Sequence, residues 1–211
     1  MDMKQLQLLA GSLFFVFAIN AHAQTPVEIK LIAAMDEDRG WCADLRGGQN
    51  NGEPIGGVHG HTCYTYNGRG PTPDQAFVME NIREHNEFRM VAFNDKCMTL
   101  YEPKAGSFPS METCDGRAAQ LIMLNESGRI TPEMMPELCL TMSSVVVPGG
   151  GGNPLHLMRD VTFETCDSEV NERQLWEMRA EWNGPEETTA ERPYVSNPNA
   201  RPPNAPPPDR Q

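Results

Sequence analysis

Three copies of one pattern of cysteines and glutamines occupy most of this chain. The clearest copy begins at Cys139-Leu140, passes through Cys166-Asp167 and ends in Gln174-Leu175-Trp176. Two looser copies precede it, running from Trp41-Cys42-Ala43 through Cys63 to Gln75-Ala76-Phe77, and from Cys97-Met98 through Cys114-Asp115 to Gln120-Leu121-Ile122. A supersecondary unit repeated at this spacing buries its apolar face against its neighbours, so the three copies predict one fold.

The copies differ in length, which places their variation in loops. The first cysteines of successive copies are 55 and 42 residues apart, and the glutamines are 45 and 54 residues apart.

The six cysteines indicate disulfides formed outside the reducing cytoplasm. Six cysteines allow fifteen pairings, and the repeat selects one pair in each copy: Cys42 with Cys63, Cys97 with Cys114, and Cys139 with Cys166. Each bridge contributes roughly 3 kcal/mol in the chain-entropy model. No Cys-x-x-Cys spacing occurs, so the cysteines do not indicate a zinc site.

The first 23 residues have the features of an export signal. Lys4 precedes a nearly uninterrupted apolar run from Leu6 to Ile19, and Ala21-His22-Ala23 fits a cleavage site, so the mature chain is expected to begin at Gln24. The apolar run is too short for a convincing membrane span, although an uncleaved amino-terminal anchor is the alternative. We therefore expect a periplasmic or extracellular protein.

The remaining chain divides into a short lead-in at 24–35, one domain at 36–182 and a tail at 183–211. Within the domain, short apolar runs such as Phe88–Phe93 and Leu121–Leu124 are bounded by Gly, Pro, Asn and Asp, which predicts an all-β chain. Asn125-Glu126-Ser127-Gly128 predicts a hairpin turn. Eight prolines with little apolar sequence between them indicate that the tail is disordered.

Charge and motifs narrow the function classes. The net charge of -12 disfavours nucleic acid and anionic membranes as partners. The glycines at 149–152 are followed by neither a Lys-Ser/Thr pair nor a helix pattern, so they do not indicate nucleotide binding. No Gly-x-Ser-x-Gly or His-Glu-x-x-His motif occurs, and we expect neither an enzyme nor a bound cofactor.

Taken together, the repeat resembles the ricin B-type lectin family. Gln174-Leu175-Trp176 fits that family's Gln-x-Trp motif, Gln75-Ala76-Phe77 keeps an aromatic residue, and Gln120-Leu121-Ile122 does not. The resemblance implies a β-trefoil with three pseudo-symmetric lobes, in which Phe77, Ile122 and Trp176 belong to the core. It also implies non-covalent binding of carbohydrate.

The family places the carboxylate of its sugar site two residues after the first cysteine of a lobe. That position is Asp44 in the first lobe, but Thr99 and Thr141 in the second and third. Because a threonine cannot provide a bidentate charged acceptor, the resemblance implies one sugar site, in the first lobe.

The resemblance also supplies the other candidates of this site. His61 falls two residues before the second cysteine, where the family has its stacking aromatic residue, and His59 matches the polar position upstream. The two imidazoles should leave the strand on one face. Asp74 and Gln75 fall where the family has its remaining polar ligand.

Three alternatives remain open at this stage. Asp44 and Arg46 could form a surface ion pair of little energetic value. The His59 and His61 imidazoles could bind Zn²⁺ or Cu²⁺, with Asp44 or Asp74 as a third ligand. With two of three carboxylates absent, the trefoil could instead be a structural or protein-binding module whose sugar sites have decayed.

Overall fold

The computed structural model describes residues 24–47, 56–67 and 70–180. The expected signal peptide at 1–23 and tail at 183–211 lie outside these ranges. Across the described part of the chain, no helix is long and apolar enough to cross a membrane.

Short strands form the framework of each copy of the repeat. The first lobe contains β1 (Pro26–Leu31), β2 (Trp41–Leu45), β3 (Val58–Thr62) and β4 (Phe77–Val78). The second contains β5 (Lys96–Thr99), β6 (Ser110–Thr113) and β7 (Ile122–Leu124). The third contains β8 (Ile130–Pro132), β9 (Leu138–Met142), β10 (Val147–Pro148), β11 (Leu157–Thr165) and β12 (Trp176–Arg179). The helical pieces are α1 (Met79–His85) and the 3-10 turns η2 (Tyr64–Asn67), η3 (Ala118–Gln120) and η4 (Ser168–Arg173).

Each lobe is built on one antiparallel hairpin whose two strands carry the paired cysteines or lead to them. These hairpins are β2–β3, β5–β6 and β9–β11. The predicted pairing is confirmed, since disulfides join Cys42 to Cys63, Cys97 to Cys114 and Cys139 to Cys166. The all-β prediction is also confirmed: the protein is a β-trefoil of three pseudo-symmetric lobes with one disulfide each.

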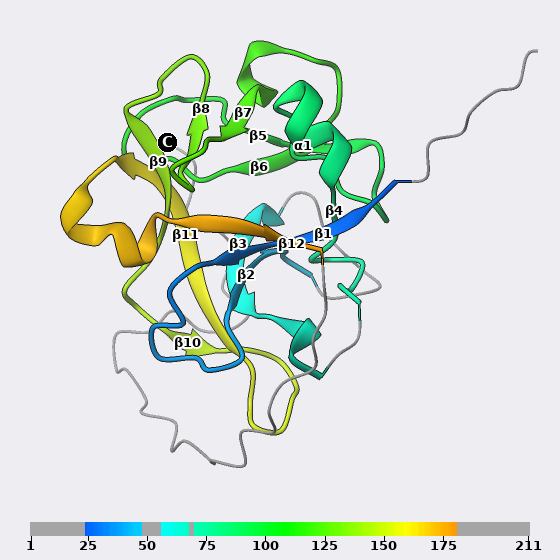
Figure 1. Cartoon of the computed structure of the whole chain (residues 1–211), viewed down its shortest axis with the longest axis vertical. Helices are drawn as coiled ribbons and strands as arrows, with labels where there is room; N and C mark the ends of the chain where they lie inside the picture. Colours follow the sequence, from blue (N-terminus) through cyan, green and yellow to red (C-terminus); the bar gives the residue numbers. More distant parts are fainter. Residues whose placement is uncertain (1–23, 48–55, 68–69, 181–211) are drawn as a thin grey trace, which may run out of the picture.

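The first and last strands close the fold. β1 pairs with β12 from Glu28 opposite Arg179 to Leu31 opposite Trp176, and the two strands run side by side across the middle of the molecule (Figure 1). β1 lies in the segment 24–35, ahead of residue 36. Its residues Val27, Ile29 and Leu31 are fully buried, so this segment contributes to the core.

One apolar core lies between the lobes. Its largest fully buried side chains are aromatic and come from all three copies: Trp41, Phe77, Phe88, Phe163 and Trp176. Ile122, which stands where the other copies have an aromatic residue, is also fully buried. The core assignments of Phe77, Ile122 and Trp176 are therefore confirmed, and the Trp176 indole N–H donates to the Leu140 carbonyl oxygen at 2.9 Å.

The predicted hairpin turn at residues 125–128 connects β7 to β8. The Asn125 side-chain oxygen accepts hydrogen bonds from the amides of Ser127 and Arg129. Gly128 has φ of +86°, and a β-carbon there would lie 3.1 Å from the Trp176 carbonyl oxygen. Glycine is therefore required by both the backbone conformation and the close approach of β12.

Candidate functional site

The three hairpins share one register, which gives every site position a counterpart in the other lobes. Asp44 lies directly opposite His59, as Thr99 lies opposite Ser110 and Thr141 opposite Thr162. The first cysteine of each lobe likewise faces the residue two positions before the second: His61, Glu112 or Glu164. The backbone thus presents one site position three times, and the side chains decide what each copy can do.

A buried glutamine connects the two halves of every lobe. In the third lobe, the Gln174 amide nitrogen donates to Thr141 Oγ1 at 2.9 Å and to the Thr165 carbonyl, while its oxygen accepts from the Asp167 amide. Gln120 makes the matching bonds in the second lobe. Gln75 does the same in the first, donating to the Thr62 carbonyl and accepting from the Tyr64 amide. We call this arrangement the glutamine clamp.

In the first lobe the clamp ends on a carboxylate instead of a hydroxyl. The Gln75 amide donates to Asp44 Oδ2 at 2.8 Å, and the other oxygen, Oδ1, lies 2.9 Å from His59 Nε2. Asp44 is only 2 % exposed. The alternative of a surface ion pair with Arg46 does not fit this burial, and the Arg46 guanidinium forms an ion pair with Asp160.

Aromatic rings gather beside Asp44. The His59 and His61 ring centroids lie 5.7 Å apart, as expected for two imidazoles on one face of β3. His61 also faces Tyr64 at 5.0 Å and His156 at 5.4 Å. Sequence reasoning passed over His156, because it lies in another copy of the repeat and no spacing within the first lobe points to it.

Asp74 is the most unusual member of the group. The Asp74 side chain is fully buried, and among the described residues neither carboxylate oxygen makes a hydrogen bond of normal geometry, although the adjacent Thr72 side chain offsets part of the rise that burial causes in the pKa of Asp74. His59 Nδ1 is likewise buried without a hydrogen bond to the described residues. Buried polar atoms in native proteins are nearly always satisfied by protein, water or ligand, so these three atoms are open to a further partner.

Burial controls the ionisation of the group. It raises the pKa of Asp44 to about 6, and the neighbouring His61 and Gln75 offset part of the rise. Burial together with the charge of Asp44 also raises the pKa of Asp74 to about 6. The pKa of His59 falls to about 3 because burial and the nearby Arg46 both disfavour the imidazolium. Near pH 7 the group therefore combines two carboxylates with neutral imidazoles.

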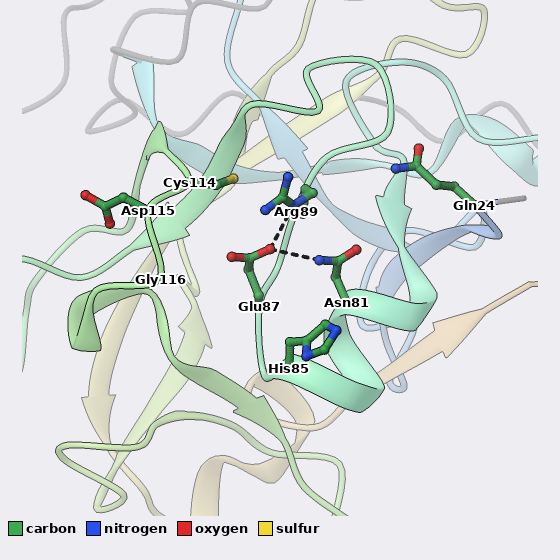
Figure 2. A pocket seen from close by; sticks show the side chains of 8 residues that line it. All are labelled: Gln24, Asn81, His85, Glu87, Arg89, Cys114, Asp115 and Gly116. Carbon is green, nitrogen blue, oxygen red and sulfur yellow. Dashed lines mark hydrogen bonds and ion pairs between the residues drawn. The ribbon is translucent and has the colours of Figure 1, made fainter. Parts of the chain in front are cut away.

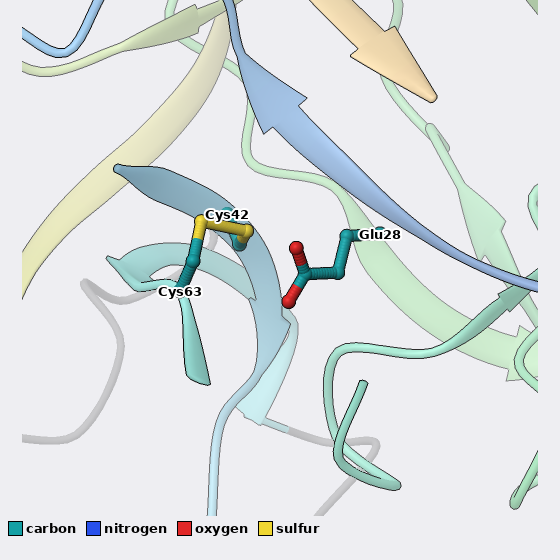
Figure 3. Close-up of side chains that lie close together, drawn as sticks. All are labelled: Glu28, Cys42 and Cys63. Carbon is teal, nitrogen blue, oxygen red and sulfur yellow. A yellow bond between two sulfur atoms is a disulfide. The ribbon is translucent and has the colours of Figure 1, made fainter. Parts of the chain in front are cut away.

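The described residues do not place His59 and His61 in a cluster of three potential metal ligands. Within the described residues, the sets of three His, Cys, Asp or Glu ligand atoms that lie within 4.8 Å of one another are Glu28–Cys42–Cys63 and Glu87–Cys97–Cys114. Neither set includes His59 or His61, and the cysteines of both are disulfide-bonded, as Figure 3 shows for the first. A disulfide sulfur cannot act as the thiolate ligand that zinc requires.

Comparison with known proteins agrees with the architecture. No family model and no curated sequence matches this chain. The solved structure of the mdaA-1 domain is 16 % identical and superposes with a TM-score of 0.50 over 74 % of this chain and 90 % of that one.

Two lectin structures superpose slightly less well. One is the Vibrio vulnificus hemolysin/cytolysin β-trefoil lectin with N-acetyl-D-lactosamine bound, at 18 % identity and a TM-score of 0.49 over 76 % of this chain and 97 % of that one. The other is the Abrus precatorius agglutinin, at 14 % identity and a TM-score of 0.49 over 75 % of this chain and 48 % of that one. At these identities the likeness concerns the fold alone.

Proposed function

We propose that this protein is exported and binds carbohydrate non-covalently at one site in the first lobe. Asp44, His59, His61 and Asp74 would contact the sugar, and Gln75 would act through Asp44 by holding its carboxylate in place. The observation that carries the proposal is a set of buried polar atoms beside Asp44 that make no hydrogen bond of normal geometry with the described residues, namely Asp74 Oδ1 and Oδ2 and His59 Nδ1. Sugar hydroxyls, which both donate and accept hydrogen bonds, are suitable partners for such atoms.

The chemistry of the two carboxylates fits this ligand class. A carboxylate accepts hydrogen bonds from two neighbouring hydroxyls, and charge makes these bonds stronger than those between neutral groups. In the structure His59 Nε2 is hydrogen-bonded to Asp44 Oδ1. Binding therefore requires a hydroxyl to replace the imidazole at that oxygen, while Gln75 remains on the other. A single site of this kind holds a monosaccharide weakly, with a Kd on the order of millimolar.

Export is supported by the amino-terminal signal pattern and the three disulfides. On this proposal the mature protein comprises residues 24–211, and its partner is a glycan or polysaccharide outside the cytoplasm.

The test is glycan-array binding by the mature protein beside an Asp44→Thr variant. Threonine is the residue that the other two lobes place under the glutamine clamp, so the variant keeps an acceptor for Gln75 and preserves the fold. We expect binding of at least one glycan to fall at least tenfold in Asp44→Thr and to be unchanged in Asp95→Asn, which neutralises an exposed carboxylate of the second lobe. Equal binding by Asp44→Thr and the parent protein would refute the proposed site.

A second candidate function is a non-catalytic protein-binding trefoil whose sugar sites have decayed. The near-complete burial of Asp44, with both oxygens already bonded within the protein, favours it. A correctly disulfide-bonded protein that binds no glycan on the array but retains a protein partner in a pull-down from the periplasm or culture medium would favour this candidate over the first.

A further inference from the structure

A cavity of about 540 Å³ lies in the second lobe, between α1 and the disulfide Cys97–Cys114. This volume falls in the range of small-molecule sites. Figure 2 shows the side chains that line it, from α1, from the segment after the helix and from the disulfide loop. Those used below are Gln24, Asn81, His85, Glu87, Arg89 and Asp115. None of these residues belongs to the first-lobe site.

Glu87 is the buried polar group of this cavity. Its side chain is only 11 % exposed, and a single oxygen, Oε1, accepts both hydrogen bonds, from Asn81 Nδ2 at 2.9 Å and Arg89 Nε at 2.8 Å. Among the described residues no hydrogen bond reaches Oε2, and Figure 2 shows the carboxylate facing the space between its neighbours. The cavity therefore contains a charged acceptor with one oxygen still able to bind a donor.

The group is held in place before any ligand arrives. Asn86 ends α1 in the left-handed conformation, and the Glu87 amide donates to the Asn81 carbonyl. The Arg89 guanidinium is anchored at its other end, where Nη1 donates to the Asn94 carbonyl at 3.0 Å. A preorganised acceptor of this kind loses little entropy when it binds.

The first lobe contains a similar arrangement in which one carboxylate oxygen is bonded by the closing strand β12 and the other, Glu28 Oε1, is buried. Glu28 stands against Cys42–Cys63 as Glu87 stands against Cys97–Cys114 (Figure 3). Glu28 Oε2 accepts hydrogen bonds from Thr65 Oγ1 at 2.7 Å and from Arg179 Nε at 3.0 Å. In the first lobe Arg179 of β12 thus covers the carboxylate and leaves Glu28 Oε1 buried, whereas in the second lobe an open pocket lies in front of Glu87.

The charges of the cavity select the class of ligand. Glu87 is balanced by Arg89 and Asp115 by Arg117, so the lining favours neither an anion nor a cation. A neutral ligand that both donates and accepts hydrogen bonds fits best, since Glu87 accepts, Arg89 donates, and the amides of Asn81 and Gln24 do both. The His85 ring at the rim offers a flat surface.

We propose that this cavity is a second carbohydrate site, which binds one neutral sugar unit through neighbouring hydroxyls at Glu87 and Arg89. The site shares its ligand class with the first-lobe site but none of its residues. Two sites on one chain would raise the avidity for a polymeric glycan well above the affinity of either site alone.

The test is a titration of the exported, isotope-labelled protein carrying Asp44→Thr, followed by amide and side-chain NMR. Galactose, glucose, mannose and N-acetylglucosamine are added separately at millimolar concentrations. We expect at least one sugar to shift the Asn81 side-chain amide, Arg89 Nε and the Gly116 amide. Glu87→Gln should lower the affinity for that sugar by about tenfold or more, because a charge-assisted hydrogen bond becomes a neutral one.

Glu84→Gln is the matched control, since it makes the same change on the same helix at an exposed residue outside the cavity. It should bind as the parent does. If Glu87→Gln does not fold, His85→Ala provides a second test. His85 is an exposed residue at the rim of the cavity, and its removal should also weaken sugar binding. The proposal is wrong if none of the four sugars shifts the three reporters, or if both cavity variants bind as tightly as the parent. Because the titration is done without Asp44, its outcome is independent of the first-lobe proposal.

Discussion

The first and third lobes hold the same glutamine in the same place but connect it to different acceptors. Gln174 donates to the Thr141 hydroxyl, and Gln75 donates to the Asp44 carboxylate, at 2.9 and 2.8 Å. The clamp needs only one acceptor atom, which a hydroxyl provides. A carboxylate brings a second oxygen and a charge that the clamp does not need. All lobes therefore share the need for one acceptor atom beside the glutamine. Only the first lobe adds a charged second oxygen, which is available for another role.

The largest loss of stability should come from substitutions in the apolar core that the three lobes share. Trp176→Ala removes a fully buried indole and its bond to Leu140, so it should lower the free energy of unfolding by about 3–5 kcal/mol. Ile122→Ala, at the matching position of the second lobe, should lower the free energy of unfolding by less, because a smaller side chain is removed. Urea denaturation measures both. If the second-lobe variant were the more damaging, Trp176 would not be the principal core anchor of the repeat.

Substitutions in the glutamine clamp should cause the next largest loss of stability. Gln174→Leu leaves the Asp167 amide and the Thr165 carbonyl without their partner, which should cost about 2–3 kcal/mol. Gln75→Leu should cost more at pH 7.5, because it also removes a donor from a buried carboxylate. Urea denaturation of the two variants side by side checks this order. Equal losses would show that Asp44 does not depend on the clamp.

The charge of Asp44 should make the first lobe sensitive to pH. Its pKa is about 6 in the folded protein and 3.8 when unperturbed, so the folded state holds the proton more tightly. The resulting stability is present below pH 3.8 and is lost as the pH rises through 6. Asp44→Asn avoids this loss, and its stability relative to the parent should rise by about 2 kcal/mol between pH 4 and pH 7.5.

Chemical denaturation at the two pH values measures this change. Thr141→Ser in the third lobe is the control, because a hydroxyl does not titrate in this range and its effect should be the same at both values. A difference between Asp44→Asn and the parent that does not change with pH would contradict a raised pKa at Asp44.

The smallest effect concerns binding at the first-lobe site. Near pH 5 most Asp44 carboxyls are protonated and lose the charge that strengthens their bonds to hydroxyls, so sugar affinity should fall about tenfold relative to pH 7.5. Calorimetric titration with a sugar that binds on the array measures it. Affinity that is unchanged at pH 5 would indicate that the sugar does not contact Asp44.

The sequence by itself determined the scaffold. Cysteine pairing, three lobes, the apolar residues after each glutamine and the turn at 125–128 all follow from spacings within one copy of the repeat, where local geometry leaves few alternatives. The choice of Asp44 came from the resemblance to the ricin B-type lectins, which places a carboxylate two residues after the first cysteine of a lobe.

Only the tertiary structure decided what these positions do. The bond from His59 to Asp44, the approach of His156 from the third lobe and the burial of Asp74 depend on packing between distant segments. The same holds for Arg179 of β12, which donates a hydrogen bond to Glu28 Oε2, and for the open pocket in front of Glu87. The hydrogen-bond partners of a buried polar group come from segments that are distant in the sequence. The spacing of residues within one repeat therefore does not predict them.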